Sequence, residues 1–334
     1  MSGRAAWLTI KMHRFEVLIA VALLALMGVS AWVVAAHMNA VTVGPECWSQ
    51  WEGSVGRLNA CQQAVERWLD VHEHESGQLT GFMGLLPAAV GVVLGVPIVA
   101  RELELRTVSF AWSLQGIRWR WLLSRLWPLL VVAIVGGVLV GFATTELRSA
   151  RLVSPFEADS MGDIARQGPV LLTRVLIGFG VGLLAGSLVG RTLPAFLVAG
   201  LLVAAWIMFA GPTIERSAAL SHVSYATDEA LSGGGVIGYG SVRPLDWLGE
   251  AYREPSGRIM DGSVYELACP GANTSGSECP ESPFVPYEDY ERMAKIVPQS
   301  AWGSIEQAET GAGLLVAGLA ILLTFPVVAR RRAG

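Results

Sequence analysis

The sequence predicts an all-α polytopic membrane protein, with six transmembrane helices and an extracellular domain between the fifth and the sixth. The 334 residues are 52% hydrophobic and only 16% charged, and the mean hydropathy of +0.48 exceeds that of an ordinary water-soluble domain. The apolar residues fall into six runs of about 18 to 22 residues, the length that a helix needs to cross about 30 Å of hydrocarbon. A polar segment of about 100 residues separates the fifth run from the sixth.

The predicted spans follow one another along the chain as continuous apolar runs. They cover Phe15 to His37, Leu79 to Ala100, Trp127 to Thr145, Val170 to Gly190, Leu193 to Gly211 and Gly311 to Ala329. Because only Arg191 and Thr192 separate the fourth run from the fifth, these two helices are expected to form a tight hairpin. The first run is too long for a signal peptide and lacks a small-residue cleavage site, so it is expected to remain a span.

Three regions follow from these spans. Residues 1–212 are expected to hold an N-terminal interfacial helix, the first five spans and a cytoplasmic helix at about residues 101–115. Residues 213–309 are expected to form the extracellular domain, an irregular unit of short helices and loops. Residues 310–334 are expected to form the last span and a basic cytoplasmic tail.

Basic residues orient the spans, because short loops rich in Lys and Arg stay in the cytoplasm. With the N-terminus inside, the cytoplasmic segments carry 12 basic residues and the two short external loops carry 5. Of the 28 acidic residues, all but Glu16, Glu102 and Glu104 fall outside. We therefore expect a multi-pass protein of the cell membrane with both termini in the cytoplasm.

The four cysteines all fall on the predicted external side, where an oxidising environment lets them pair. Cys47 and Cys61 lie in the first external loop, and Cys269 and Cys279 lie in the large domain. Three connectivities are possible, and the local pairs Cys47–Cys61 and Cys269–Cys279 are the simplest.

Several kinds of site are excluded. A phosphate-binding P-loop needs Lys directly after Gly, but Lys11 and Lys295, the two lysines of the chain, follow Ile10 and Ala294, so the chain cannot itself be a P-loop ATPase. The external stretch His72-Glu73-His74-Glu75 is expected to bind no metal, because neighbours two apart on a helix do not share a face and no third ligand is evident. No catalytic motif and no nucleic-acid partner are expected.

Charges and glycines within the spans carry further predictions. Arg174 lies near the external end of its span and Glu16 near the internal end of the first, so both are expected to snorkel to the membrane surface. A proton relay or an ion-coupled carrier then has little to work with. The fourth span has glycines at four-residue spacing, which favour close packing within one bundle over a dimer contact; they are Gly178, Gly182, Gly186 and Gly190.

A charged and Trp-rich stretch, ARELELRTVSFAWSLQGIRWRWLL, follows the second span at residues 100–123. Glu102 and Arg106 stand four residues apart, a favourable helix pair, and apolar residues after them indicate a short amphipathic helix. Arg118 to Trp121 then alternate Arg and Trp, a pattern typical of interfacial anchoring before a helix re-enters the bilayer.

This stretch resembles the signature between the second and third spans of ABC-2 type transporter permeases, in particular an actinobacterial subgroup. The resemblance rests on Arg101-Glu102-Leu103-Glu104, Thr107, Ala111-Trp112, Gln115 and Arg118-x-Arg120-Trp121-Leu122. Two later stretches are similar to the same subgroup, Gly190 to Ala195 at the hairpin and Pro298 to Trp302 before the last span. Arg106 departs from the family pattern, in which Gly usually precedes the Thr, and this change puts partner specificity in doubt.

The resemblance implies a transport subunit without enzymatic activity of its own, which works with a separate ABC ATPase subunit and a second permease copy in the lipid bilayer. It implies no cofactor in this chain, and it places ATP and Mg on the ATPase. The implied ATPase-coupling residues are Arg101, Glu102, Glu104, Arg106, Thr107, Trp112, Gln115, Arg118 and Arg120. The implied substrate cavity exposes Phe82, Met83, Trp206, Met208 and Phe209, although lipid-facing side chains would look the same.

The function expected from these observations is export of a hydrophobic or amphipathic compound, such as a drug or antibiotic, a lipid or a peptide. One alternative is a non-transporting complex in which ATP hydrolysis moves the extracellular domain to regulate an envelope partner. Deleting residues 213–297 separates the two, because transport can partly survive the deletion whereas a mechanical role cannot. A further alternative is a structural or immunity membrane protein without an ATPase, whose charged stretch would tolerate charge reversal.

Overall fold

A computed structural model describes nine segments of the chain, residues 3–41, 43, 47, 60–107, 118–151, 168–227, 247–253, 256–261 and 291–331. Two compact units divide the chain. The helical unit comprises Met1–Val153, Gly162–Glu215 and Glu306–Gly334, and the sheet unit comprises Ser154–Met161 and Arg216–Ile305.

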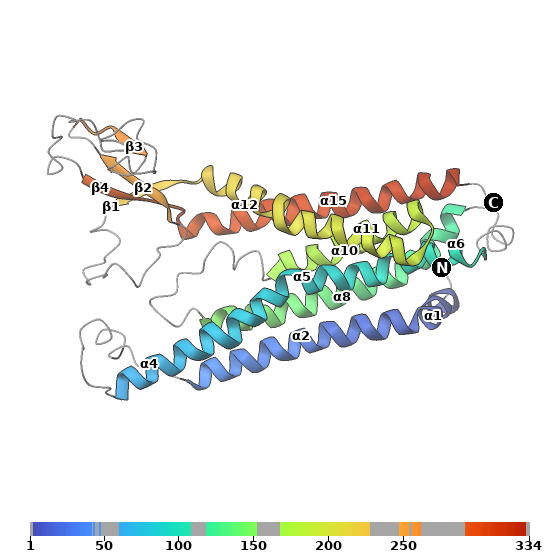
Figure 1. Cartoon of the computed structure of the whole chain (residues 1–334), viewed down its shortest axis with the longest axis horizontal. Coiled ribbons are helices and arrows are strands. Elements are labelled where there is room, and N and C mark those ends of the chain that lie inside the picture. Colours follow the sequence, from blue (N-terminus) through green and yellow to red (C-terminus); the bar gives the residue numbers. More distant parts are fainter. Residues whose placement is uncertain are drawn as a thin grey trace. The chain divides into compact units, whose positions relative to one another are not determined.

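The helical unit is built from long apolar helices (Figure 1). In chain order its elements are α1 (Gly3–Met12), α2 (Arg14–Ala40), α4 (Ala60–Asp70), the π-helical η1 (Val71–Ser76), α5 (Gly77–Gly95), α6 (Pro97–Glu104), α8 (Arg118–Arg151), α10 (Gly168–Val189), α11 (Thr192–Ala205), the π-helical η2 (Trp206–Ala210), α12 (Gly211–Leu220) and α15 (Trp302–Arg330). Within the described residues, six stretches are long and apolar enough to cross a membrane. They begin at Arg14, Gly77, Arg118, Gly168, Thr192 and Trp302, which confirms the predicted order of six spans.

The centre of the helical unit is the contact between α5 and α10, which glycines allow to come very close. A Cβ atom on Gly178 would overlap the carbonyl oxygen of Ala88, and one on Gly186 would lie 2.6 Å from the carbonyl oxygen of Val96. Gly182 faces the same helix, with Val92 Cα 3.2 Å from the position of its missing Cβ. Gly178, Gly182 and Gly186 therefore pack within one chain, as predicted, and bring two backbones together, whereas Gly190 lies in the turn after α10.

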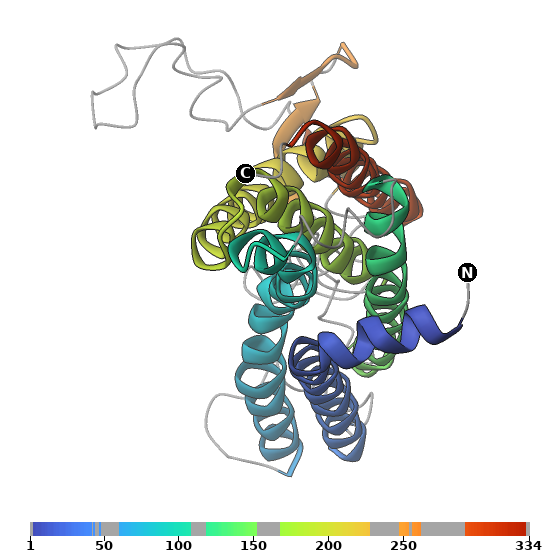
Figure 2. The same ribbon diagram turned by 90° about the vertical axis from the view of Figure 1, so that its right-hand side faces the viewer.

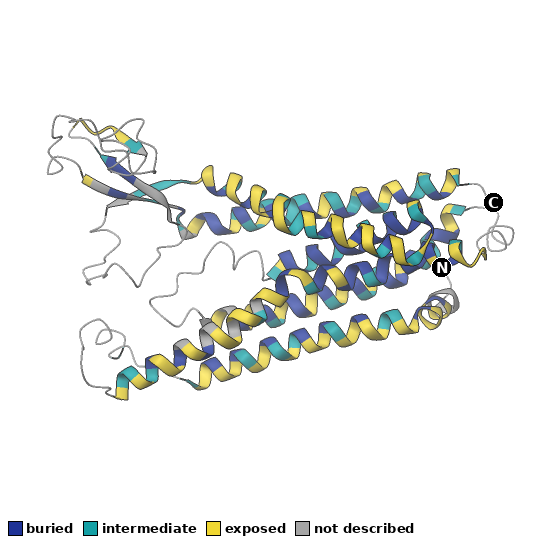
Figure 3. Cartoon of the chain, viewed as in Figure 1, coloured by how far each residue is buried: buried dark blue, intermediate teal, exposed yellow. Residues whose placement is uncertain are grey.

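Burial varies widely among the six spans. α10 is largely buried, whereas α2 and α11 expose most of their side chains (Figure 3). The exposed side chains of α2 include Leu18, Leu26 and Trp32, which are residues suited to contact with lipid tails rather than with water. α1 is a separate short helix that lies across the axis of α2 (Figure 2) and exposes Trp7 and Leu8.

The hairpin between α10 and α11 turns at Gly190, which has a φ of +69°. This left-handed conformation is accessible to Gly at little cost, and the Gly190 amide still donates to the carbonyl of Gly186 at 3.0 Å. The tight turn predicted from the two-residue gap between the runs is confirmed.

The helix bounds differ from the apolar runs in two places. The second run was expected to be one helix from Leu79 to Ala100, but α5 ends at Gly95 and α6 begins at Pro97, a residue that lacks an amide proton and suits the first turn of a helix. The fifth run was expected to end at Gly211, but the helix continues through η2 and α12 to Leu220. The added turns contain polar residues such as Glu215 and Arg216. A membrane helix can therefore continue past the end of its apolar run.

The sheet unit corrects the prediction of short helices and loops. Its described residues form an antiparallel sheet of four strands in the order β1-β4-β2-β3. The strands are β1 (Ser224–Thr227), β2 (Trp247–Arg253), β3 (Ile259–Asp261) and β4 (Glu291–Ile296). Ala251 pairs with Met293, both are buried, and an ion pair of 2.9 Å joins Arg253 to Glu291.

A disulfide joins Cys47 to Cys61, the local pair favoured for the first loop. The same region carries a hydrogen bond of 3.0 Å between the imidazole of His37, near the end of α2, and the carboxylate of Glu75 of η1. The His37–Glu75 contact joins the end of α2 to the helix that leads into α5. Cys269 and Cys279 lie outside the described residues.

Candidate functional site

The candidate site lies where α6 ends, at the end of the helical unit where α2 begins and α15 ends. We call this the termini end. The amide of Arg106 donates to the carbonyl of Leu103 at 3.2 Å, and the amide of Thr107 donates to the carbonyl of Glu102 at 3.1 Å. This bond pattern is a Schellman motif, so a single helix over residues 101–115 does not form.

Arg106 occupies the left-handed position of this motif, with a φ of +56°. Gly favours this conformation, whereas a side chain makes it unfavourable by roughly 1–2 kcal/mol. The geometry therefore gives a physical reason for Gly at this position of the family pattern, and it identifies Arg106 as a residue held under backbone strain.

We expect Arg106→Gly to raise the melting temperature of the detergent-solubilised chain. Relief of the left-handed strain, less the extra chain entropy of Gly in the unfolded state, leaves a gain of about 0.5–1 kcal/mol. Leu105→Gly is the matched control, because Leu105 has a φ of −79° and gains nothing from Gly. Equal shifts of the two variants in a thermal denaturation assay would contradict the assignment.

Glu102 points into the bundle and is buried. Its carboxylate forms an ion pair of 3.2 Å with Arg125 of α8. Burial raises the pKa of Glu102, and the positive charge of Arg125 lowers it in part. The predicted helix pair between Glu102 and Arg106 is wrong, because α6 ends at Glu104 and the partner of Glu102 comes from another span.

Two further residues of α6 connect this helix to other spans. Arg101 forms an ion pair of 3.3 Å with Glu16 of α2. Glu104 accepts hydrogen bonds from the hydroxyl of Thr192 at 2.6 Å and from the Thr192 amide at 2.9 Å. These bonds lower the pKa of Glu104 and satisfy an amide at the start of α11 that has no partner within its own helix. The end of α6 is thus attached to α2, α8 and α11.

Arg118 and Arg120 lie at the start of α8. Arg118 donates to the carbonyls of Ala329 and Arg331 at 2.7 and 2.8 Å, so it caps the end of α15, where free carbonyls and the helix dipole favour a cation. The guanidinium of Arg120 lies 5.4 Å from the centre of the Trp119 ring, which agrees with interfacial anchoring. Trp112 and Gln115, the other two predicted coupling residues, lie outside the described residues.

His13, between α1 and α2, is buried, and neither ring nitrogen has a hydrogen-bond partner among the described residues. It lines a pocket of about 350 Å³, which we call the head pocket and which includes both charged and apolar side chains. The other lining residues are Met12, Arg101, Glu102, Leu105, Thr107 and Arg125. Burial lowers the pKa of His13, Glu16 opposes this shift, and Arg125 and Arg101 add to it.

We expect the chain to lose thermal stability below about pH 6.5, the ordinary pKa of His, and His13→Leu to reduce this loss. The pKa of His13 is lower in the folded chain, so between the two pKa values the unfolded chain binds the extra proton and stability falls as the pH falls. Glu102 has the opposite effect on the pH dependence of stability. Because its pKa is raised in the folded chain, protonation of Glu102 favours the folded state. The measurement is therefore the difference between the two melting curves from pH 7.5 to pH 5, and parallel curves would contradict the role of His13.

The predicted substrate residues are dispersed. Trp206 and Phe209 line a shallow apolar cleft of about 530 Å³ on η2 and its flanking helices. Phe82 and Met208 are exposed, but Met83 is completely buried, so Met83 lines no open surface of the single chain. The π-helical turn η2 interrupts the α-helical pattern of this span at Trp206–Ala210. Such turns are often found at functional sites.

Arg174 does not snorkel, contrary to prediction. It is buried in α10, donates to the carbonyl of Gly84 at 2.8 Å and pairs with Glu309 of α15 at 3.5 Å. Glu309 is missing from the prediction because the sixth apolar run begins after it, at Gly311. The hydropathy pattern alone has no signal that would place Glu309 inside the bundle, since its position depends on Arg174.

These features define a class of protein: a polytopic helical membrane protein with a charged connection after its second span. The family model for ABC-2 membrane transporter related proteins matches residues 17–216, which is more than half of the chain. The chain therefore belongs to this family, in line with the resemblance of residues 101–122 to its signature. No curated protein and no solved structure matches the chain.

Proposed function

We propose that the chain is the permease subunit of an ATP-binding-cassette exporter, which moves a hydrophobic or amphipathic substrate outward with energy from a separate ATPase subunit. Membership of the ABC-2 related family supports this proposal. The observation that carries it is the attachment of α6 to three spans, through Arg101, Glu102 and Glu104. A displacement of the segment after α6 would therefore act on α2, α8 and α11 together.

In this proposal the termini end faces the cytoplasm, and the ATPase docks beside residues 101–120. The excess of basic residues in the segments at this end supports the orientation. The sheet unit then lies outside the cell. Two copies of the chain and two ATPase subunits form the transporter, and ATP and Mg bind to the ATPase subunits.

The substrate class follows from the exposed apolar surface of the fifth span. The cleft at Trp206 and Phe209 is almost entirely apolar, and the polar side-chain groups of its lining residues are the Thr213 hydroxyl and the Trp206 indole N–H. An aromatic cleft without charge suits a drug, a lipid or an apolar peptide. Such a ligand would bind through buried area rather than through directed hydrogen bonds.

We expect the tagged chain to co-purify with the ABC ATPase encoded nearest to its gene and to stimulate ATP hydrolysis. Glu104→Gln is expected to retain ATPase binding but to reduce the stimulation several-fold, because a neutral amide oxygen accepts weaker hydrogen bonds from Thr192 than a carboxylate does. The control is Glu66→Gln, which changes an exposed carboxylate of α4. A chain that binds no ATPase would refute the proposed function, and full stimulation by Glu104→Gln would refute the connection to α11.

A further inference from the structure

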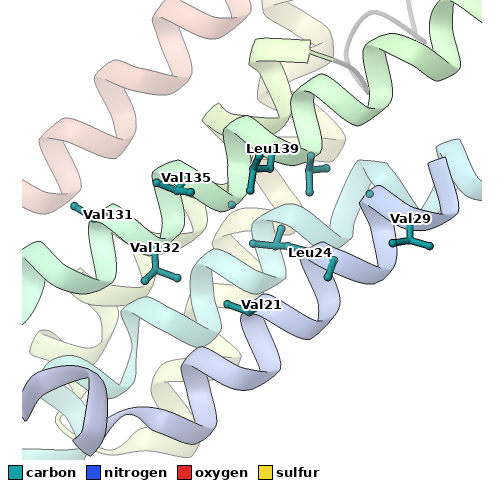
Figure 4. A pocket seen from close by; sticks show the side chains of 11 residues that line it. Val21, Leu24, Val29, Val131, Val132, Val135 and Leu139 are labelled. Atoms are coloured by element: carbon teal, nitrogen blue, oxygen red, sulfur yellow. The ribbon is translucent and has the colours of Figure 1, made fainter. Parts of the chain in front are cut away.

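A second pocket lies between α2 and α8, farther from the termini end than the head pocket. It is a groove of about 620 Å³ lined by Val21, Leu24 and Gly28 on one side and by Val132, Gly136 and Val140 on the other, among others. Figure 4 shows aliphatic side chains of both helices along it. We call it the tail groove. Its walls offer no side-chain hydrogen-bond donor or acceptor, so any occupant must be apolar where it lies in the groove.

The head pocket is lined mainly by α6 and the residues that follow it, but His13, just before α2, and Arg125 of α8 lie on the helix faces that continue into the tail groove. His13, Leu24 and Gly28 are spaced by 11 and 4 residues, and Arg125, Val132 and Gly136 by 7 and 4, which are repeats that return to one helix face. At 1.5 Å per residue, Val21 lies about 12 Å along α2 from His13. The two pockets are therefore aligned along these helices, with the fully buried Ala20 and Leu129 between them. We call the two pockets together the strip; its charged side chains lie at the termini end.

The polar end of this strip has unused hydrogen-bonding capacity. Arg125 donates to Met12 Sδ and pairs with Glu102, and Arg101 pairs with Glu16. A guanidinium has five N–H donors, so with respect to the described residues both arginines retain donors for a further acceptor. His13 is buried in this pocket with both ring nitrogens unsatisfied among the described residues. Because such a group is unfavourable in isolation, the head pocket is suited to a ligand with several acceptor oxygens.

Charge favours an anionic ligand at this position. The two carboxylates neutralise the two arginines, so the pocket itself is close to balanced. The positive excess comes from the residues that flank Met12 and His13 in the chain: Lys11 lies over the ring of Trp7, and Arg14 lies over the ring of Phe15. Basic side chains stacked on aromatic rings at a membrane surface attract anionic head groups.

We propose that the strip between α2 and α8 binds one anionic phospholipid, with its phosphate in the head pocket and an acyl chain in the tail groove. The half-thickness of the hydrocarbon core is about 15 Å, so a chain anchored near His13 reaches the groove beside Val21 and Leu24. This lipid is a bound constituent of the subunit rather than its cargo, and the inference does not depend on the proposed export function.

The test is native mass spectrometry of the full chain in detergent, with phosphatidylglycerol or phosphatidylcholine added. The wild-type chain is expected to retain one phosphatidylglycerol and to bind phosphatidylcholine about tenfold more weakly, because the latter carries a positive group beside its phosphate. Val132→Phe, which fills the groove, is expected to lose the lipid adduct. Val138→Phe is the matched control, because Val138 is an exposed valine of the same helix outside the groove.

A second variant tests the polar end without leaving a buried charge unpaired. Glu102→Gln with Arg125→Gln is expected to reduce the preference for phosphatidylglycerol without abolishing it, since the groove is intact and one of the two guanidinium groups of the head pocket is gone, whereas Arg101 remains. Ala25→Leu fills the groove from α2 and replaces Val132→Phe if the latter does not fold. Equal retention of phosphatidylglycerol by the groove-filled and control variants, or equal retention of both lipids by the wild type, would overturn the proposal.

Discussion

Gly91→Ala is expected to force α5 away from α10 and to lower the thermal stability of the chain sharply. A Cβ at Gly91 would overlap the carbonyl oxygen of Val175 and lie 2.6 Å from the amide nitrogen of Phe179. Both atoms belong to a helix backbone, so no change of side-chain rotamer can make room. Overpacking of this kind costs typically 1–3 kcal/mol, and here it acts on the central helix contact of the unit.

Gly81→Ala on the same helix is the matched control. A Cβ at Gly81 has no atom within 4 Å, and Ala is favoured over Gly in a helix by about 0.8–1 kcal/mol. The two substitutions add the same methyl group and are expected to shift the melting temperature in opposite directions. If both variants melt together in a fluorescence-detected thermal scan, the close approach of α5 and α10 is not what holds the bundle together.

The contact between α5 and α10 shows which part of the fold is predictable from sequence. Span number and the face of α10 that packs are local properties, because a run of apolar residues and a four-residue glycine repeat act within one helix. Gly178 and Gly182 therefore indicate close packing before any partner is known. The repeat does not predict that α5 is the partner helix, since an apolar helix face can pack equally well against lipid or against any other apolar helix.

The partners of charged residues are less predictable from sequence than the spans, because these partners lie far away in the chain. The spacing of Glu102 and Arg106 predicts a helix pair, yet the helix ends between them and Glu102 pairs with Arg125. Hydropathy likewise excludes Glu309 from the last span, although the helix that contains it begins at Trp302. In both cases a carboxylate is tolerated inside the bundle because an arginine of another span neutralises it.

The sheet unit shows a different limit. Glu291–Ile296, the sequence ERMAKI, becomes β4, one of the two inner strands of the sheet, although Glu, Met, Ala and Lys all favour helix. Pairing with β1 and β2 on both sides overrides this preference. Strands of 3 to 7 residues are too short for an alternating pattern to stand out, and β2 is 20 residues away from β1 along the chain.

Glu309→Gln is expected to destabilise the chain strongly, because it removes a buried negative charge that lies 3.5 Å from the buried guanidinium of Arg174. Both side chains are almost inaccessible, with exposed fractions of 7% and 4%. Removal of one partner of such a pair costs about 3–5 kcal/mol, since the remaining charge cannot reach water. Arg174 would keep the carbonyl of Gly84 as an acceptor, but a neutral carbonyl does not compensate a full charge.

The exposed pair Arg253–Glu291 provides the control for Glu309→Gln. Its nitrogen–oxygen distance of 2.9 Å is shorter than the 3.5 Å of Arg174–Glu309, but its side chains are 40% and 47% exposed. Surface pairs contribute about 0–1 kcal/mol, so Glu291→Gln is expected to change stability little. A comparison of the two variants by thermal denaturation separates the effect of burial from that of distance.

The double variant Arg174→Met with Glu309→Leu decides whether the pair is needed as a charge pair or only as matched volume. Replacing a buried pair by apolar residues of similar size is often neutral or stabilising, so the double variant is expected to be more stable than Glu309→Gln alone. The coupling is read from a double-mutant cycle. Because the pair and the Gly84 carbonyl connect α5, α10 and α15, a double variant as unstable as the single one would mean that the polar link among these three spans is itself required for the fold.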